Sequence, residues 1–146
     1  MEHKITNIFV HGPISPAFIA DRIAAHSTKA EIGAHGIFLG QVRADTIGEH
    51  TVTAIEYTAY ESMACQQMHR IREALFAKYP LTCLHVYHSL GRVEAGEICL
   101  VVFTSAVHRR AALDACDELV EGIKAELPIW GREIFEDKTH QWKINT

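Results

Sequence analysis

The chain has 146 residues, of which 48% are hydrophobic and 22% are charged, and its formal net charge is −4. This length and balance fit one domain, residues 1–146, with an ordinary hydrophobic core. The basic residues are scattered along the chain, which argues against a nucleic-acid-binding surface, and no apolar run is long enough for a membrane helix. Met1-Glu2-His3-Lys4 leads into a short apolar run without a signal-peptide pattern, so we expect a cytoplasmic protein.

The first elements in chain order are two strands with a helix between them, followed by a third strand. Residues 4–10 predict a short strand, and Ser15 followed by Pro16 predicts a helix start, with serine as N-cap and proline in the first turn. Residues 33–43 and 51–60 are rich in β-forming side chains and predict strands separated by a polar turn.

The clearest helix spans residues 61–79, where apolar side chains recur at helical spacing until Pro80 stops it. The remaining expected elements, in order, are strands at 81–90 and 97–104, a helix at 109–127, and an extended pair at 129–135 and 141–144. Short turns between neighbouring strands favour antiparallel pairing. The order predicts an α+β fold with helices packed on a mixed, mainly antiparallel sheet.

None of the four cysteines belongs to a C-x-x-C pair, and each falls within an apolar pattern. We therefore expect buried free thiols. The ten histidines raise the alternative of a metal-binding protein. Only His85 and His88 are close in sequence, and their spacing on a strand points them to opposite faces, so we expect no metal site.

Three positively charged positions are candidates for a functional site. Arg43 ends the strand that contains Gly40-Gln41-Val42, and it either holds an anion or is simply solvated. His108, Arg109 and Arg110 begin a helix, where basic side chains oppose the helix dipole unless an anion binds there; the alternative is that they point into water.

Lys124 is the third position, at the border of the buried face of the 109–127 helix. A lysine that is half-buried against apolar groups can take part in acid–base chemistry, but from the residues alone a lysine stem lying along a core edge is the more common explanation of such a position. No nucleophile elbow, glycine-rich phosphate loop or H-E-x-x-H motif is present. The residues alone therefore indicate an α+β domain with a candidate anion-binding cleft.

An ordered set of short segments, spread over nearly the whole chain, resembles the large subunits of molybdopterin synthase. The segments are Gly40-Gln41-Val42-Arg43, Glu56-Tyr57-Thr58-Ala59-Tyr60, Met63-Ala64, His88-Ser89-Leu90-Gly91, Gly96-Glu97, Ser105-Ala106-Val107-His108-Arg109, Lys124, Pro128-Ile129-Trp130-Gly131-Arg132-Glu133 and Trp142-Lys143. No single segment is decisive, but the order and spacing of the set are specific.

The resemblance implies a fold, a reaction and partners. The fold is an α/β hammerhead with an additional antiparallel β subdomain. The reaction is a sulfur transfer that converts cyclic pyranopterin monophosphate into molybdopterin, with no metal or organic cofactor. A small ubiquitin-like subunit delivers each of two sulfurs as the thiocarboxylate of its C-terminal Gly-Gly tail. Two large subunits form a homodimer within a heterotetramer.

The resemblance also assigns roles to residues. It implies that Gln41, Val42 and Arg43 line the substrate pocket, that His108 and Arg109 hold anionic parts of the substrate, and that Lys124 is the essential lysine. Arg132 and Glu133 match the end of the family's W-K-R-E or W-K-K-E motif.

The chain departs from the family at Gly131, where a second pocket lysine is usual, and Gln41 also stands where a lysine is common. Arg132 points to the opposite face of an extended segment, which leaves Lys138 or Lys143 to replace the missing charge. The alternative is a diverged paralogue that binds the sulfur carrier or the pterin with little turnover.

Arg109 and Lys124 lie near opposite ends of one predicted helix, about 22 Å apart at the rise of an α-helix. If both contact one substrate, they come from different chains. The sequence therefore predicts a homodimer with active sites shared between its subunits.

Overall fold

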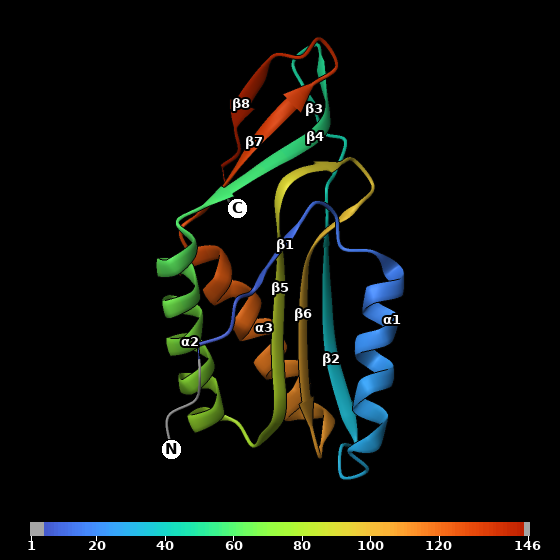
Figure 1. The fold of residues 1–146 in the computed structure, drawn as a ribbon, viewed down its shortest axis with the longest axis vertical. Helices are drawn as coiled ribbons and strands as arrows, with labels where there is room; N and C mark the ends of the chain where they lie inside the picture. The colour runs from blue at the N-terminus through green and yellow to red at the C-terminus, as the bar shows by residue number, and fades with distance from the viewer. Residues whose placement is uncertain (1–4, 145–146) are drawn as a thin grey trace.

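The computed structural model describes residues 5–144, which form an eight-stranded sheet with three α-helices and one short 3-10 helix (Figure 1). The helices are α1 (Pro16–Ala25), η1 (His26–Thr28), α2 (Glu61–Lys78) and α3 (Arg109–Glu126). The strands are β1 (Phe9–His11), β2 (Ala34–Gln41), β3 (Thr46–Ile47), β4 (His50–Ala59), β5 (Leu81–Glu94), β6 (Ile98–Ala106), β7 (Ile129–Phe135) and β8 (His140–Trp142).

Strand β5 connects the two halves of the molecule. Its first part pairs with β6, and its last part, from Gly91 to Glu94, pairs with β4. Gly91 has a φ of 82°, a conformation that glycine adopts without steric cost, and Figure 1 shows β5 curving there toward the upper strands. The strand order is β2-β6-β5-β4-β7-β8, with β1 beside β5 and β3 beside β4.

This topology confirms the predicted α+β class. Among the described strands, only the pairing of β1 with β5 is parallel, so the sheet is mixed and mainly antiparallel, as expected. Strands β3, β4, β7 and β8 form the additional antiparallel subdomain, which stands above the helices in Figure 1.

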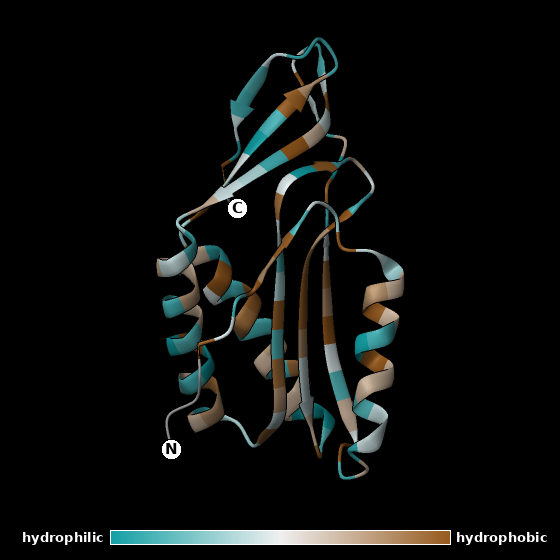
Figure 2. Cartoon of the chain, viewed as in Figure 1, coloured by the Kyte–Doolittle hydropathy of each residue, from teal (hydrophilic) through white to brown (hydrophobic). Residues whose placement is uncertain are grey.

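The lower half of the sheet is covered on both faces. The helices α2 and α3 pack on one face of the sheet over the main core. Val86 of β5 and the alternating residues Leu100 and Val102 of β6 point into this core. On the other face, Ile19 of α1 packs against Val101, and Phe18 meets the Tyr87 ring edge-on. Figure 2 shows hydrophobic residues concentrated along β6, whereas β8 is largely hydrophilic.

Helix α3 approaches β2 closely at Gly36. A Cβ atom on this residue would lie 2.6 Å from the Ala112 carbonyl oxygen and 2.9 Å from the Cys116 Cβ. The buried Thr104 hydroxyl donates to the same Ala112 carbonyl at 2.7 Å. These contacts fix the position of α3, and with it the position of Lys124.

The local predictions hold for most elements. Ser15 is the N-cap of α1, where its hydroxyl accepts a hydrogen bond from the Phe18 amide at 3.1 Å. The predicted strand at 4–10 is shorter in the structure and begins at Phe9, and Lys4 lies outside the described residues. The strand predicted at 81–90 is longer in the structure, where β5 continues to Glu94.

The four cysteines are free, and three of them are buried, as the sequence predicted. Between residues 5 and 144, no helix combines the length and the apolar character needed to cross a membrane.

The packing of α3 yields a prediction with a matched control. Gly36→Ala must push backbone of α3 away from β2, and we expect it to lower the free energy of unfolding by about 1–3 kcal/mol. Gly122→Ala lies within α3, where the new Cβ meets only Ile71 side-chain atoms at 3.6 Å or more and a Glu126 oxygen at 3.9 Å. It should raise stability by about 0.5–1 kcal/mol through helix propensity. Urea denaturation measures the free energy of unfolding of both variants. An unchanged free energy of unfolding in Gly36→Ala would show that α3 does not lie this close to β2.

Candidate functional site

A small pocket lies where α3 ends and β7 begins, and it contains Lys124. Its lining comes from β4, β5, α3, β7 and the segment after β8. The lining residues are Tyr57, His88, Ile123, Lys124, Leu127, Ile129, Gly131 and Lys143.

The end of α3 places Lys124 at this pocket. The helix stops at Leu127, whose extended conformation precedes Pro128, and Lys124 occupies the last turn. A cation there complements the negative end of the helix dipole. Ile123 points into the core, whereas Lys124 is exposed. The predicted half-buried position is therefore wrong, because the side chain leaves the core at the pocket's open side.

Three residues form a row across the neighbouring strands. Tyr57 on β4 pairs with Gly131 on β7, and the Lys143 amide donates a hydrogen bond to the Gly131 carbonyl at 2.8 Å. Directly paired residues of antiparallel strands project to the same face of a sheet. Lys143 therefore stands on the face that a side chain at position 131 would occupy, and it is half-buried there.

Because Gly131 has no side chain, neighbouring side chains occupy the space beside its Cα atom. A Cβ atom there would lie 2.9 Å from Cγ2 of Ile55 and 3.2 Å from Cε1 of Tyr57. A side chain at position 131 thus requires the Tyr57 ring or the Ile55 methyl group to move. The glycine is part of this packing arrangement and not merely a missing lysine.

The polar groups deeper in the pocket are uncharged at neutral pH. Burial lowers the pKa of His88 to about 4, and the nearby Lys124 charge contributes further. The His88 Nδ1–H donates to the Ser89 carbonyl at 2.8 Å, which leaves Nε2 as the acceptor. Burial also raises the pKa of Tyr57, whose hydroxyl donates to Cys99 Sγ at 3.4 Å. Within this lining, positive charge therefore comes from Lys124 and Lys143.

Arg43 belongs to a charged group beside the pocket. It holds Asp45 through two contacts, Nε to Oδ1 at 2.7 Å and Nη2 to Oδ2 at 3.2 Å. The hydrogen bond from Arg43 lowers the pKa of Asp45, and the charge of Lys143 acts in the same direction. The charge of Glu133 adds to the effect of Asp45 in raising the pKa of Arg43. The charge of Glu133 thus acts on Arg43, and the charges of Arg43 and Lys143 both act on Asp45 beside the pocket.

The other predicted residues of β7 and β2 lie outside the pocket lining. Arg132 pairs with Glu56 at 2.7 Å on the face opposite Gly131, as strand alternation requires. Glu133 is buried and accepts a 3.3 Å hydrogen bond from Gln141. Gln41 is exposed at the end of β2, whereas Val42 is buried in the main core.

His108 and Arg109 are not near Lys124 within one chain. They begin α3 and Lys124 lies in its last turn, so about 22 Å separates the Cα atoms of Arg109 and Lys124. The His108 and Arg109 side chains are exposed, the first turn contains no acidic residue, and His108 makes no capping hydrogen bond. This helix end is basic, as the sequence predicted, and the structure shows that it also lacks a side-chain cap.

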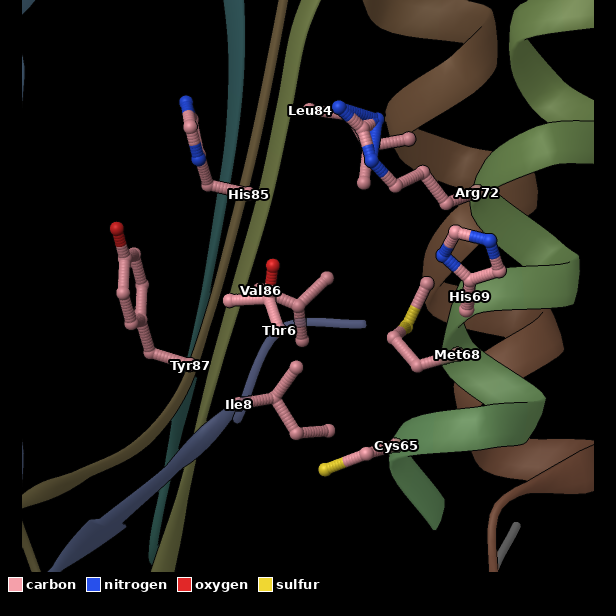
Figure 3. A pocket seen from close by; sticks show the side chains of 10 residues that line it. All are labelled: Thr6, Ile8, Cys65, Met68, His69, Arg72, Leu84, His85, Val86 and Tyr87. Carbon is pink, nitrogen blue, oxygen red and sulfur yellow. The ribbon is translucent and has the colours of Figure 1, made fainter. Parts of the chain in front are cut away.

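A second pocket lies between α2 and the free edge of β5 (Figure 3). Figure 3 shows Leu84 and Val86 pointing toward α2, whereas His85 and Tyr87 lie on the other side of the strand. Apolar side chains make up most of its lining, and no lysine lines it. Arg72 is the one lysine or arginine among its lining residues, so this pocket lacks the pair of cations found in the first pocket.

Sequence reasoning missed two residues of the first pocket and left a third undecided. Tyr57 and His88 lie in segments that carry the family resemblance, but their places in the pocket depend on the pairing of β4 and β7 and the path of β5. Of the two lysines considered as replacements at position 131, the structure places Lys143 in the pocket. Lys138 lies in the β7–β8 turn with a φ of 69°.

Comparisons with known proteins identify the family to which this chain belongs. The family model described as "MoaE protein" matches residues 10–126. A molybdopterin synthase catalytic subunit from Pyrococcus abyssi (strain GE5 / Orsay) is 34% identical over 120 residues, which cover 82% of this chain and 80% of the relative. One from Drosophila grimshawi is 41% identical over 115 residues, 77% of this chain but only 32% of the relative. The matched region thus spans about a third of that longer protein.

The fold is shared with a solved structure. The crystal structure of molybdopterin synthase from Staphylococcus aureus superimposes with a TM-score of 0.83 and 29% sequence identity, over 97% of this chain and 99% of that one. The family model covers most of the sequence, and the P. abyssi relative is matched over most of its length. This chain therefore belongs to the MoaE family, whose members include molybdopterin synthase catalytic subunits.

Proposed function

We propose that this protein is the catalytic subunit of a molybdopterin synthase, a sulfurtransferase. It converts cyclic pyranopterin monophosphate into molybdopterin with two sulfurs from the C-terminal thiocarboxylate of a small ubiquitin-like carrier. The observation that carries the proposal is the convergence of Lys124 and Lys143 in one pocket of a MoaE-family fold.

The charges of the pocket suit this reaction. The pterin substrate has a cyclic phosphate, and the thiocarboxylate of the carrier is also an anion, so two negative groups must approach each other. Fixed cations in a partly dry site lower the energy of that encounter. Lys124 is exposed enough to meet an incoming chain terminus, and an ammonium group can also donate a proton as the phosphate ring opens.

Neutral groups form the rest of this pocket. His88 and Tyr57 are uncharged at neutral pH, because burial lowers the pKa of His88 and raises that of Tyr57. The apolar residues of the lining are Ile123, Leu127 and Ile129. Surroundings with a low dielectric constant strengthen the attraction between an anion and each lysine. No metal or organic cofactor is needed for the transfer.

Lys143 takes the place of the lysine that the family usually has at position 131. It is the cross-strand neighbour of Gly131, it shares the face on which a residue-131 side chain would project, and it lines the pocket. Arg132 is held by Glu56 on the other face. Arg43, bound to Asp45, and Glu133 lie outside the lining, and their charges act beside Lys143 on this side of the pocket.

The expected partners follow from the same reaction. A small ubiquitin-like subunit inserts its Gly-Gly thiocarboxylate tail at the pocket, and two copies of this chain form a homodimer within a heterotetramer. The separation of Arg109 from Lys124 along α3 supports a site shared between subunits, with His108 and Arg109 of one chain facing Lys124 of the other. The four free cysteines fit a reducing compartment, so we place the protein in the cytoplasm.

We expect Lys124→Ala to reduce molybdopterin formation by roughly 10²–10⁴-fold, because the substitution removes a cation and proton donor at the reacting groups. The measurement is single-turnover product yield with thiocarboxylated carrier and the cyclic pterin. Since Lys124 is exposed, thermal unfolding of the variant should match that of the wild type. An unchanged yield would remove Lys124 from the mechanism.

Lys143→Ala should lower the same yield roughly 10- to 100-fold, because this residue supplies the second fixed cation. Lys138→Ala is the matched control: it removes an equal charge from the β7–β8 turn and should leave the yield unchanged. Equal effects of the two substitutions would indicate a general charge effect and contradict the specific role of Lys143.

The shared site is tested by mixing Arg109→Ala protein with Lys124→Ala protein under conditions of subunit exchange. A mixed dimer contains one intact site if the two residues act across the interface, so activity should return to as much as about a quarter of the wild-type level after statistical exchange. Labelled subunits verify the exchange. Proven exchange without recovered activity would show that each site is built within one chain.

A further inference from the structure

Three metal-binding side chains meet on the sheet face opposite α2 and α3, away from the lysine pocket. His26 lies at the junction of α1 and η1, and Cys83 and His85 lie on β5. Their ligand atoms all lie within 4.8 Å of one another. The alternation of β5 explains the pairing: residues 83 and 85 project to one face, as Figure 3 shows for His85, while Leu84 projects toward α2.

His26 is held in the form that a metal ligand needs. It is 9% exposed, and its Nδ1 lies 2.7 Å from the Arg22 carbonyl oxygen. A carbonyl only accepts hydrogen bonds, so Nδ1 carries the proton and Nε2 keeps its lone pair. A backbone carbonyl that orients the second ring nitrogen is a typical partner of metal-bound histidine.

Cys83 has a basic partner. Its buried Sγ lies 2.9 Å from Nζ of Lys29, and this contact is the main cause that raises the pKa of the lysine. Metals bind the thiolate form of cysteine. The Lys29 side chain is solvent-exposed and can turn outward when a cation arrives.

His85 closes the group on the other side. Its ring centroid is 5.0 Å from that of His26, with the planes at 74°, and Phe103 stacks beneath His26 at 4.6 Å. Arg22, Lys29 and Arg72 are positively charged groups near His85, and a bound cation would have to be compensated by the negative charge of the Cys83 thiolate.

We propose that His26, Cys83 and His85 bind one Zn²⁺ ion, with water as the fourth ligand. Tetrahedral zinc with nitrogen and sulfur ligands requires ligand atoms about 3.3–3.6 Å apart, as bond lengths of about 2.0–2.3 Å dictate. In the structure the ligand atoms lie within 4.8 Å of one another, so ion binding would require them to approach by at most about 1.5 Å. Imidazole and thiolate donors select zinc over magnesium or calcium.

The ion would attach the end of α1 to the centre of the sheet. Helix α1 has only one buried residue, Ile19, so its own packing against the sheet is limited. A metal that joins His26 to β5 links residues far apart in sequence, and its binding free energy adds to the stability of the folded state. This role is independent of the proposed sulfur transfer.

The test uses full-length protein stripped of metal with a chelator and then titrated with Zn²⁺ against a chromophoric competitor. Wild type should bind one ion per chain and gain thermal stability, whereas Cys83→Ser and His85→Gln should each bind at least tenfold more weakly. His140→Ala removes an exposed histidine of β8 and should bind as wild type does. Bound Co²⁺ should give a thiolate charge-transfer band in wild type that Cys83→Ser lacks.

The Co²⁺ spectrum and thermal unfolding of the metal-free variants separate loss of the site from loss of the fold. Absence of stoichiometric binding by folded wild type would overturn the proposal. Undiminished Zn²⁺ affinity in folded Cys83→Ser, or equal weakening by His140→Ala, would do the same, because binding would then belong to scattered surface histidines.

Discussion

The hydrogen bond from the Lys143 amide to the Gly131 carbonyl determines the character of the pocket. It continues the antiparallel pairing of β7 with β8 beyond Trp142 and places a lysine directly opposite the glycine. Tyr57 occupies the other side of the same row and fills the space that a side chain at position 131 would need. The pairing of these strands thus explains why position 131 has little space for a lysine side chain and why Lys143 lies beside it.

The second constraint is the direction of α3. The close approach at Gly36 and the hydrogen bond from Thr104 to the Ala112 carbonyl hold its middle against the sheet. Its last turn therefore reaches the pocket, while its first turn carries His108 and Arg109 to the far end of the lower sheet. One rigid helix separates two basic groups that the family resemblance assigns to one substrate, which is why we infer that two chains share each site.

Sequence patterns were sufficient for the three α-helices and most of the strands, because these elements have strong local signals; the two-residue strand β3 and the short helix η1 were not predicted. Ser15 and Pro16 mark the start of α1, Pro80 and Pro128 follow the ends of α2 and α3, and short turns separate most neighbouring strands. The continuation of β5 past Gly91 was not predicted, since a strand can bend at a glycine that otherwise resembles a turn.

The candidate site was less predictable because its residues are joined by tertiary contacts. Lys124 and Gly131 were evident from the resemblance, but the choice between Lys138 and Lys143 depended on strand register. Burial holds the pKa of His88 well below neutral pH, and no local pattern in the sequence reveals that burial. The His26, Cys83 and His85 group was missed for the same reason: only His85 and His88 looked close, whereas the fold joins His85 to a histidine from α1.

The most direct test of the account is turnover by the unmodified protein, compared with Gly131→Lys. Thiocarboxylated carrier and cyclic pyranopterin monophosphate are supplied, and molybdopterin is quantified together with the carrier consumed. If Lys143 completes the pocket, the wild type forms product with two carriers used per molecule, and Gly131→Lys gives no gain because Tyr57 and Ile55 occupy the space. A wild type that binds the carrier without turnover, together with an active Gly131→Lys variant, would contradict the account and identify the chain as a binding paralogue.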